Sequence, residues 1–62
     1  MLTDFVEYRV VDARQPLAIH LFTYSLDRCE HWAKTAGKQF YPDTEFKFQG
    51  RRAGHKFWED IQ

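Results

Sequence analysis

The chain has 62 residues, a mass of 7.5 kDa, and nine basic side chains against nine acidic ones. A chain of this length forms one domain, residues 1–62, and buries only about 60% of the surface that its unfolded form exposes. Its single cysteine, Cys29, cannot form an internal disulfide, which is typical of proteins in a reducing cytoplasm. No apolar run reaches the roughly 20 residues of a membrane span, and the first residues lack the pattern of a signal peptide. We therefore expect a cytoplasmic domain that is too small for an ordinary enzyme with a substrate cleft.

Two alternating segments at the start of the chain predict an antiparallel hairpin. Residues 4–12 (DFVEYRVVD) and 17–24 (LAIHLFTY) are rich in β-branched and aromatic side chains and alternate with a period of two. The connection, residues 13–16, is short enough to pair them directly. One face is expected to carry the core residues Val6, Tyr8, Val10, Leu17, Ile19 and Leu21, and the other face Phe5, Val11, Ala18, His20, Phe22 and Tyr24.

A helix is expected to follow at Ser25, a residue that is favoured as an N-cap. Asp27 then lies in the first turn, where a negative charge suits the helix dipole. One apolar stripe at helical spacing is formed by Leu26, Cys29, Ala33 and Ala36. Gly37 is predicted to end the helix as its C′ residue.

Two more strands are predicted in the last third of the chain. Residues 44–51 alternate, with Phe46 and Phe48 inward, and Gly50 is a candidate β-bulge. Residues 55–61 (HKFWEDI) form a last strand whose phase the pattern leaves open. The predicted order is ββαββ, an α+β fold in which a small antiparallel sheet carries a single helix on one face.

One helix covers only one side of such a sheet. The other side is expected to expose the aromatic side chains Phe5, His20 and Phe22, rimmed by charged and polar residues. An exposed apolar patch with a polar rim marks an interface more often than a bare surface, so a partner or a homodimer through this open face is one interpretation. The alternatives are that the C-terminal residues fold back over the patch, or that these rings are scattered surface side chains.

The charge is uneven although it sums to zero. Residues 1–30 hold three basic and five acidic side chains, whereas residues 31–62 hold six and four. Four cations without an intervening acid, Lys47, Arg51, Arg52 and Lys56, lie close in sequence to Trp58 and other aromatics. Basic and aromatic residues together can bind nucleic acid, the rings stacking on bases and the cations meeting phosphates. A solvated hairpin turn, or a surface that docks on an acidic protein, explains the same run.

The titratable residues do not predict a catalytic or metal site. Cys29 and His31 are two apart on the expected helix and point roughly 160° apart, so they cannot share a metal ion or act as nucleophile and base. Cys29 lies on the apolar stripe, where a buried thiol is expected. We therefore expect no enzyme activity, no metal and no cofactor.

The helix start Ser25-Leu26-Asp27 and the ending KFWEDIQ, residues 56–62, carry a resemblance. With the ββαββ order, the chain resembles very small phage-encoded inhibitors of host machinery: anti-CRISPR proteins directed at multi-subunit surveillance complexes, and the small RNA-polymerase inhibitor of coliphages. The ending looks like the terminal strand of one type I-F anti-CRISPR protein. The resemblance implies steric occlusion of a host complex, and it assigns no role to an individual residue.

These observations together predict a non-catalytic binding module, with anti-CRISPR activity as its leading form. The expected partner is a host protein or protein–nucleic-acid complex, reached in the host cytoplasm. The alternative is a small nucleic-acid-binding or transcription-regulating protein, or an RNA-polymerase inhibitor. The residues expected to contact the partner are Phe5, His20, Phe22, Lys47, Arg51, Arg52, Lys56 and Trp58.

Overall fold

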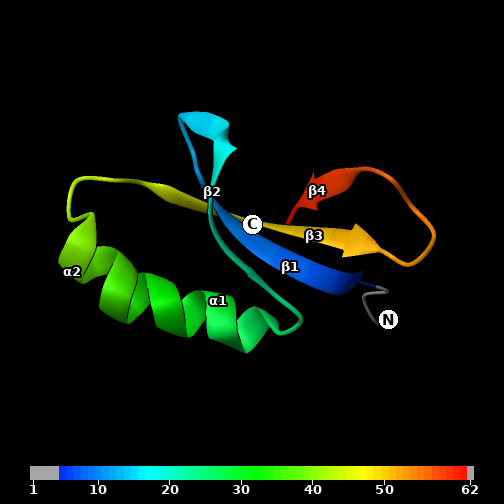
Figure 1. The fold of residues 1–62 in the computed structure, drawn as a ribbon, viewed down its shortest axis with the longest axis horizontal. Helices are drawn as coiled ribbons and strands as arrows, with labels where there is room; N and C mark the ends of the chain where they lie inside the picture. Colours follow the sequence, from blue (N-terminus) through cyan, green and yellow to red (C-terminus); the bar gives the residue numbers. More distant parts are fainter. Residues whose placement is uncertain (1–4, 62) are drawn as a thin grey trace.

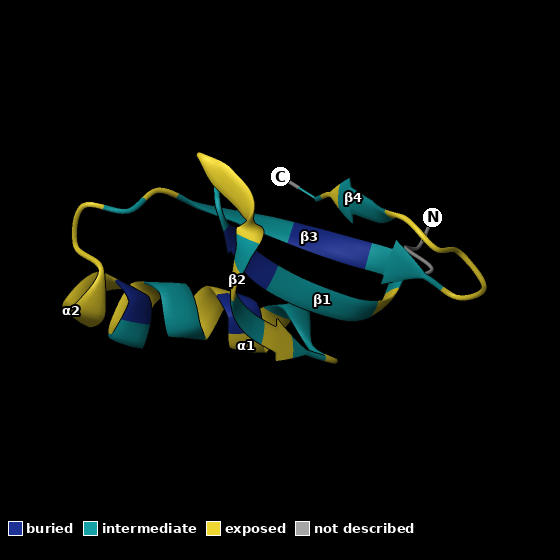
Figure 2. Cartoon of the chain, turned by 45° about the horizontal axis from the view of Figure 1, so that its top comes forward, coloured by how far each residue is buried: buried dark blue, intermediate teal, exposed yellow. Residues whose placement is uncertain are grey.

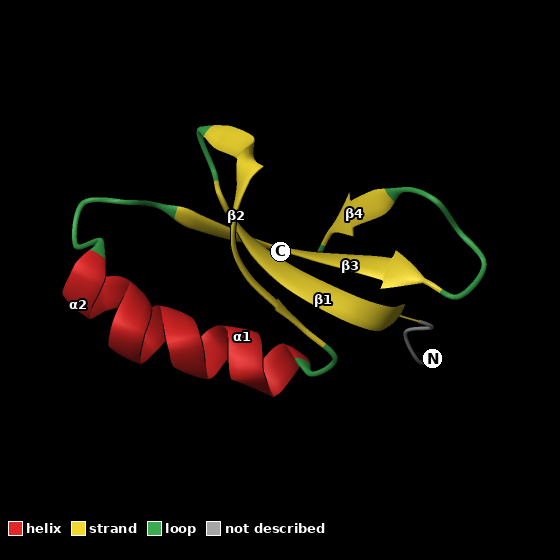
Figure 3. Ribbon diagram, viewed as in Figure 1, coloured by secondary structure: helices red, strands yellow, loops and turns green. Residues whose placement is uncertain are grey.

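The computed structural model describes residues 5–61, which form a four-stranded antiparallel sheet with one helix against it (Figure 1). In chain order the elements are β1 (Phe5–Asp12), β2 (Gln15–Thr23), α1 (Leu26–Trp32), η1 (Ala33–Gly37), α2 (Lys38–Phe40), β3 (Phe46–Arg52) and β4 (Trp58–Asp60). In space the strand order is β2-β1-β3-β4, so β2 and β4 are the edges. Figure 3 shows the helical segments as one run along one side of the sheet. The predicted α+β class and ββαββ order are confirmed.

A β-bulge in β2 decides which side chains of this strand face the helix. Val10 of β1 lies opposite Leu21, but the next residue, Val11, lies opposite Ile19, so β2 has one extra residue, His20. A bulge of this kind interrupts the alternation of faces along the strand. Ile19 therefore shares the face of Val11, and the His20 ring joins the helix side, where it contacts three aromatic rings.

Because of such irregularities, several residues of the predicted core row do not face the helix. Leu17 and Ile19 were expected inside, but Leu17 is 96% exposed and Ile19 is 52% exposed. Leu17 lies beyond a further register shift in the same pairing, between Val11 and Asp12. Another bulge, between Phe5 and Glu7 of β1, removes Val6 from the predicted row, and Val6 is also exposed. The prediction for these residues was wrong because strict alternation cannot anticipate a bulge. Asp4, with which the first strand was predicted to begin, lies outside the described residues.

The core that remains is small and lies where the helix crosses β1 and β2. Val10 and Cys29 are fully buried there, as predicted. Figure 2 shows a buried segment within β1 and one within α1, and half-buried segments along the rest of β1. The half-buried residues on this side are Tyr8, Leu21, Phe46 and Phe48, all of which were predicted to face the core. Val11 is fully buried on the other side of the sheet, where its register partners are Ile19 and Lys47.

The helix begins at Leu26, one residue after Ser25, as expected. Ser25 is extended, with φ −137°, and its backbone carbonyl accepts the N–H groups of Arg28 and Cys29. The expected side-chain cap is not formed, since the described structure shows no capping bond from the Ser25 hydroxyl. None of the helical segments within residues 5–61 has both the length and the apolar content of a membrane span.

The helix does not end at Gly37, and this prediction was wrong. Gly37 has a helical φ of −61°, and the chain continues helically to Phe40 after a π-helical middle segment. A Cβ at Gly37 would lie 2.9 Å from the Trp32 ring and 3.0 Å from the Phe46 ring. The glycine is therefore explained by the close approach of these rings.

Gly50 was predicted as a bulge, but the pairing is regular on both sides of it, with Tyr8 in β1 and with Glu59 in β4. A Cβ at Gly50 would lie 2.7 Å from the Phe5 ring and 3.0 Å from Ile61. The absence of a side chain thus lets Phe5 and Ile61 approach the middle of β3. The last strand is shorter than predicted, and its phase places Trp58 on the opposite side of the sheet from Ile61.

The replacement Gly37→Ala tests the close packing of the helix. Alanine favours the helix by about 1 kcal/mol over glycine, whereas overpacking a filled site costs about 1–3 kcal/mol. Because the nearest atoms belong to rigid rings, we expect a net loss of about 1 kcal/mol in the free energy of unfolding, measured by urea denaturation. In a Trp32→Leu background, which removes the nearest ring, the same change should cost less; an equal loss in both backgrounds would contradict the steric explanation.

Candidate functional site

The helical segments run along one side of the sheet, and we call the opposite side the open face (Figure 3). Arg9 of β1 lies opposite both Phe22 and Gln49, and Gln49 in turn lies opposite Asp60. Directly opposed residues point to the same side of a sheet, so these rows define the face. Its residues are Glu7, Arg9, Val11, Ile19, Phe22, Lys47, Gln49, Arg51, Trp58 and Asp60.

The centre of the open face is a stack that we call the Trp58 cluster, made of Arg9, Phe22, Tyr24 and Trp58. The Arg9 guanidinium carbon lies 4.2 Å from the centroid of the Trp58 ring, a cation–π contact. The Phe22 ring meets Trp58 edge-on, with centroids 6.0 Å apart, and meets Tyr24 at 5.6 Å. Phe22 and Tyr24 are 49% and 74% exposed, so the cluster presents aromatic surface in a fixed arrangement.

A series of polar contacts across the sheet holds the Arg9 side chain in place. Its Nε donates to Gln49 Oε1 at 2.8 Å, and Gln49 Nε2 donates to Asp60 Oδ1 at 2.9 Å. Lys47 Nζ lies 3.3 Å from the other oxygen of Asp60. The hydrogen bond from Gln49, and then that from Lys47, lower the pKa of the Asp60 carboxyl, while burial lowers the pKa of Arg9.

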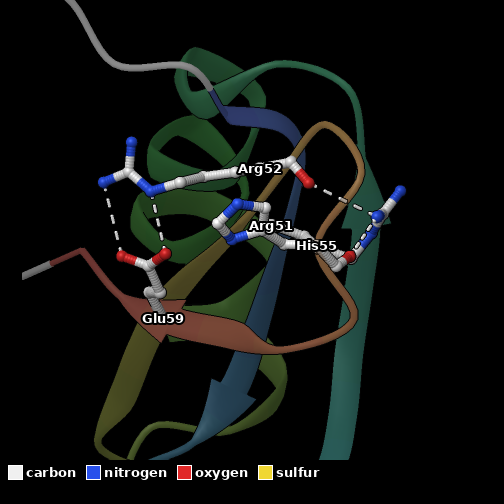
Figure 4. Close-up of polar contacts among 4 residues, drawn as sticks. All are labelled: Arg51, Arg52, His55 and Glu59. Carbon is white, nitrogen blue, oxygen red and sulfur yellow. Dashed lines mark hydrogen bonds and ion pairs between the residues drawn. The ribbon is translucent and has the colours of Figure 1, made fainter.

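Arg51 ties the face to the turn between β3 and β4. Its Nε donates to Glu7 Oε1 at 2.7 Å, which joins β3 to β1. Its Nη1 donates to the backbone carbonyls of His55 at 2.6 Å and Arg52 at 3.4 Å (Figure 4). The bond between the side chains lowers the pKa of Glu7 and raises that of Arg51.

Arg52 points to the other side of the turn, as Figure 4 shows. Its Nε and Nη2 donate to the two oxygens of Glu59, at 2.8 and 3.3 Å, and its guanidinium lies 4.5 Å from the Phe5 centroid. The basic run predicted from the sequence is therefore divided between two faces. Three of its four cations, Lys47, Arg51 and Arg52, are paired with carboxylates of the same chain.

Like Arg52, the expected contact residues Phe5 and His20 are not on the open face. Phe5 lies on the helix side, edge-on to Tyr8 at 6.1 Å and against Gly50. His20 lies among Trp32, Tyr41 and Phe46, with ring centroids 4.7–5.8 Å away, and its Nε2 is buried without a hydrogen-bond partner in the described structure. The predicted placement of both residues was wrong because each lies at or beside a bulge. Phe22, Lys47, Arg51 and Trp58 are brought together on the open face, while Lys56 is exposed in the turn.

A groove of about 580 Å³ between β2 and α1 was not predicted. Its strand side is the consecutive segment 21–23, and its helix side consists of residues spaced by three or four. The lining residues are Leu21, Phe22, Thr23, Asp27, Arg28, His31, Trp32 and Thr35. The helix spacing was visible in the sequence, but the position of the helix relative to the edge of β2 was not.

Cys29 is fully buried, as predicted, and this burial raises the pKa of its thiol. Within residues 5–61, no three side chains of His, Cys, Asp or Glu come together in a way that could hold a metal ion. Comparison with protein-family models, with curated proteins and with solved structures found no match. The functional inference therefore depends on the open face and on the groove.

The ion pairs predict how stability depends on pH. The pKa values of Glu7 and Glu59 are lower in the folded chain than their ordinary value of 4.5, so these pairs stabilise the fold above that pH. As the pH falls below 4.5 the unfolded chain takes up protons first, and we expect the melting temperature, followed by circular dichroism, to drop.

The double variant Glu7→Gln/Glu59→Gln should melt lower than the native chain at pH 7 and lose part of this acid dependence. The matched control Glu30→Gln changes an exposed helical carboxyl and should leave the profile unaltered. An acid profile that is identical in the double variant and the native chain would contradict a role for these pairs.

Proposed function

We propose that the chain is a non-catalytic binding module, encoded by a phage or mobile element, that inhibits a host protein–nucleic-acid complex by covering part of its surface. The observation that carries the proposal is the Trp58 cluster on the open face. Tryptophan, tyrosine and arginine are the residues that most often contribute the binding energy of protein interfaces. Because Arg9 and Trp58 already stack in the free chain, binding would immobilise few additional rotamers.

The charge arrangement favours a protein surface over phosphate as the immediate contact. Lys47, Arg51 and Arg52 each lie within 3.3 Å of a carboxylate oxygen, so a phosphate would have to compete with an internal partner. The alternative of a small nucleic-acid-binding or transcription-regulating protein depends mainly on Lys56 and the neighbouring His55, which are exposed in the turn.

Anti-CRISPR activity is the leading form of the proposal, because the chain resembles small inhibitors of this kind in its element order and its ending. Inhibition of RNA polymerase is the second form. In either case the module acts in the host cytoplasm, and the open face, rather than a pocket with reactive groups, is the functional surface. A homodimer through the open face is an outcome that the experiments below can detect.

A plaque assay tests the leading form directly. The chain is expressed in a bacterium whose type I-F system targets the infecting phage, and we expect plaque formation to be restored by several orders of magnitude. The variant Phe22→Ser removes an exposed ring from the Trp58 cluster and should lower affinity for the captured complex at least about tenfold. The control Phe40→Ser removes a ring of similar exposure, 68%, at the end of α2 and should retain activity. Equal activity of native chain and Phe22→Ser would overturn the open face as the functional surface.

Salt dependence separates a protein contact from a phosphate contact. A binder that neutralises several phosphates loses affinity steeply between about 50 and 200 mM salt, whereas an aromatic interface changes little. We expect the complex captured from lysate to survive nuclease treatment and to show a shallow salt dependence in a titration with the purified target. Recovery of bulk nucleic acid only, lost on nuclease treatment, would replace the inhibitor by the nucleic-acid-binding alternative.

A further inference from the structure

The two edges of the sheet are protected very differently. β4 is three residues long and carries Glu59 and Asp60, both features that hinder pairing with another strand. β2 spans nine residues, Gln15–Thr23, and has no Lys, Arg, Asp or Glu. Its protective features are Pro16 near its start and the two register shifts on either side of the Val11–Ile19 pair, which leave the segment 21–23 regular. In the segment 21–23 the outer edge of β2 is therefore a regular row of backbone donors and acceptors without such protection.

Exposed apolar side chains accompany this edge. Leu17, Ile19 and Phe22 on the strand are 96%, 52% and 49% exposed, and Tyr24, which follows it, is 74% exposed. Figure 2 shows the exposed colour along much of β2, and Figure 1 shows the tip of the β1–β2 hairpin projecting away from the helix. The groove between β2 and α1 runs beside the segment 21–23. Backbone pairing at this edge would thus be supported by side-chain contacts on both sides.

We propose that β2 pairs antiparallel with β2 of a second copy of the chain, so that the two sheets become one. An antiparallel pair of identical strands is self-complementary about a two-fold axis and needs no second type of surface. Because β2 carries no charge, two copies bring no like charges together, whereas self-pairing of β4 would bring Glu59 and Asp60 of both copies together.

The area of a standard protein interface is larger than one strand edge can supply, so the dimer must use more of the surface. A standard interface buries about 800 Å² per partner, which is roughly a sixth of the 4719 Å² surface of this chain. One strand edge is narrow, so the groove and the exposed side chains of Leu17 and Ile19 must contribute. Interfaces at the low end of this size range are weak or transient, so we expect a reversible association.

Sedimentation velocity across concentrations from about 1 µM to about 1 mM tests the dimer by mass action. The native chain should change from monomer to dimer, and Leu17→Lys/Ile19→Lys should stay monomeric over the whole range because it places charges on the pairing edge. Both positions are exposed, so the variant should fold, which its circular dichroism verifies. The control Phe57→Lys makes the same kind of change at a residue that is 79% exposed outside β2, and it should dimerise like the native chain.

Hydrogen exchange locates the contact. At high concentration, amides within Gln15–Thr23 should exchange more slowly, while those of Trp58–Asp60 should not change. A chain that stays monomeric at 1 mM overturns the proposal. So does a dimer that dissociates in Trp58→Ala, whatever Leu17→Lys/Ile19→Lys does, since that dimer uses the open face, to which Ile19 also belongs. These measurements need no host component, so their failure is distinguishable from failure of the inhibitor proposal.

Discussion

The extra residue at His20 is the constraint on which the rest of the structure depends. By inserting one residue between Leu21 and Ile19, the bulge turns His20 toward the helix side and Ile19 toward the open face. The aromatic group around Trp32 and Phe46 includes the His20 ring only because of this shift. Leu17 lies beyond a further register shift, between Val11 and Asp12, and is almost fully exposed at the hairpin tip.

Because few side chains are fully buried, polar contacts across the sheet determine much of how its strands and side chains are arranged. The Glu7–Arg51 pair joins β1 to β3, and the Arg52–Glu59 pair joins β3 to β4. Exposed ion pairs of this type contribute little stability individually, but the pair with Glu59 also fixes the Arg52 guanidinium over the Phe5 ring. Three of the four cations that looked available in the sequence are thus paired with carboxylates of the chain.

The sequence predicted those features that follow from strong periodicity: the element order, the inward side of Phe46 and Phe48, the burial of Cys29 and the start of the helix. It failed where one residue changes the phase, at Val6 and His20, and where packing overrides a local preference, at Gly37 and Gly50. Of the candidate site, Phe22, Lys47, Arg51 and Trp58 share a face, but their pairing partners come from three strands. Such cross-strand partners depend on register, which no local pattern in a single sequence determines.

The geometry of a β2 dimer bears on how the open face would act. When two antiparallel strands are related by a two-fold axis perpendicular to the sheet, equivalent faces of the two sheets lie on the same side of the joined sheet. Both helices then lie on one side of the joined sheet, and both Trp58 clusters lie on the other. A dimer of this form would present two identical aromatic surfaces to one large target, and simultaneous contact raises avidity without any new contact type. Under both proposals, a target with two equivalent sites within reach of the two clusters would be bound more tightly than a target with one such site.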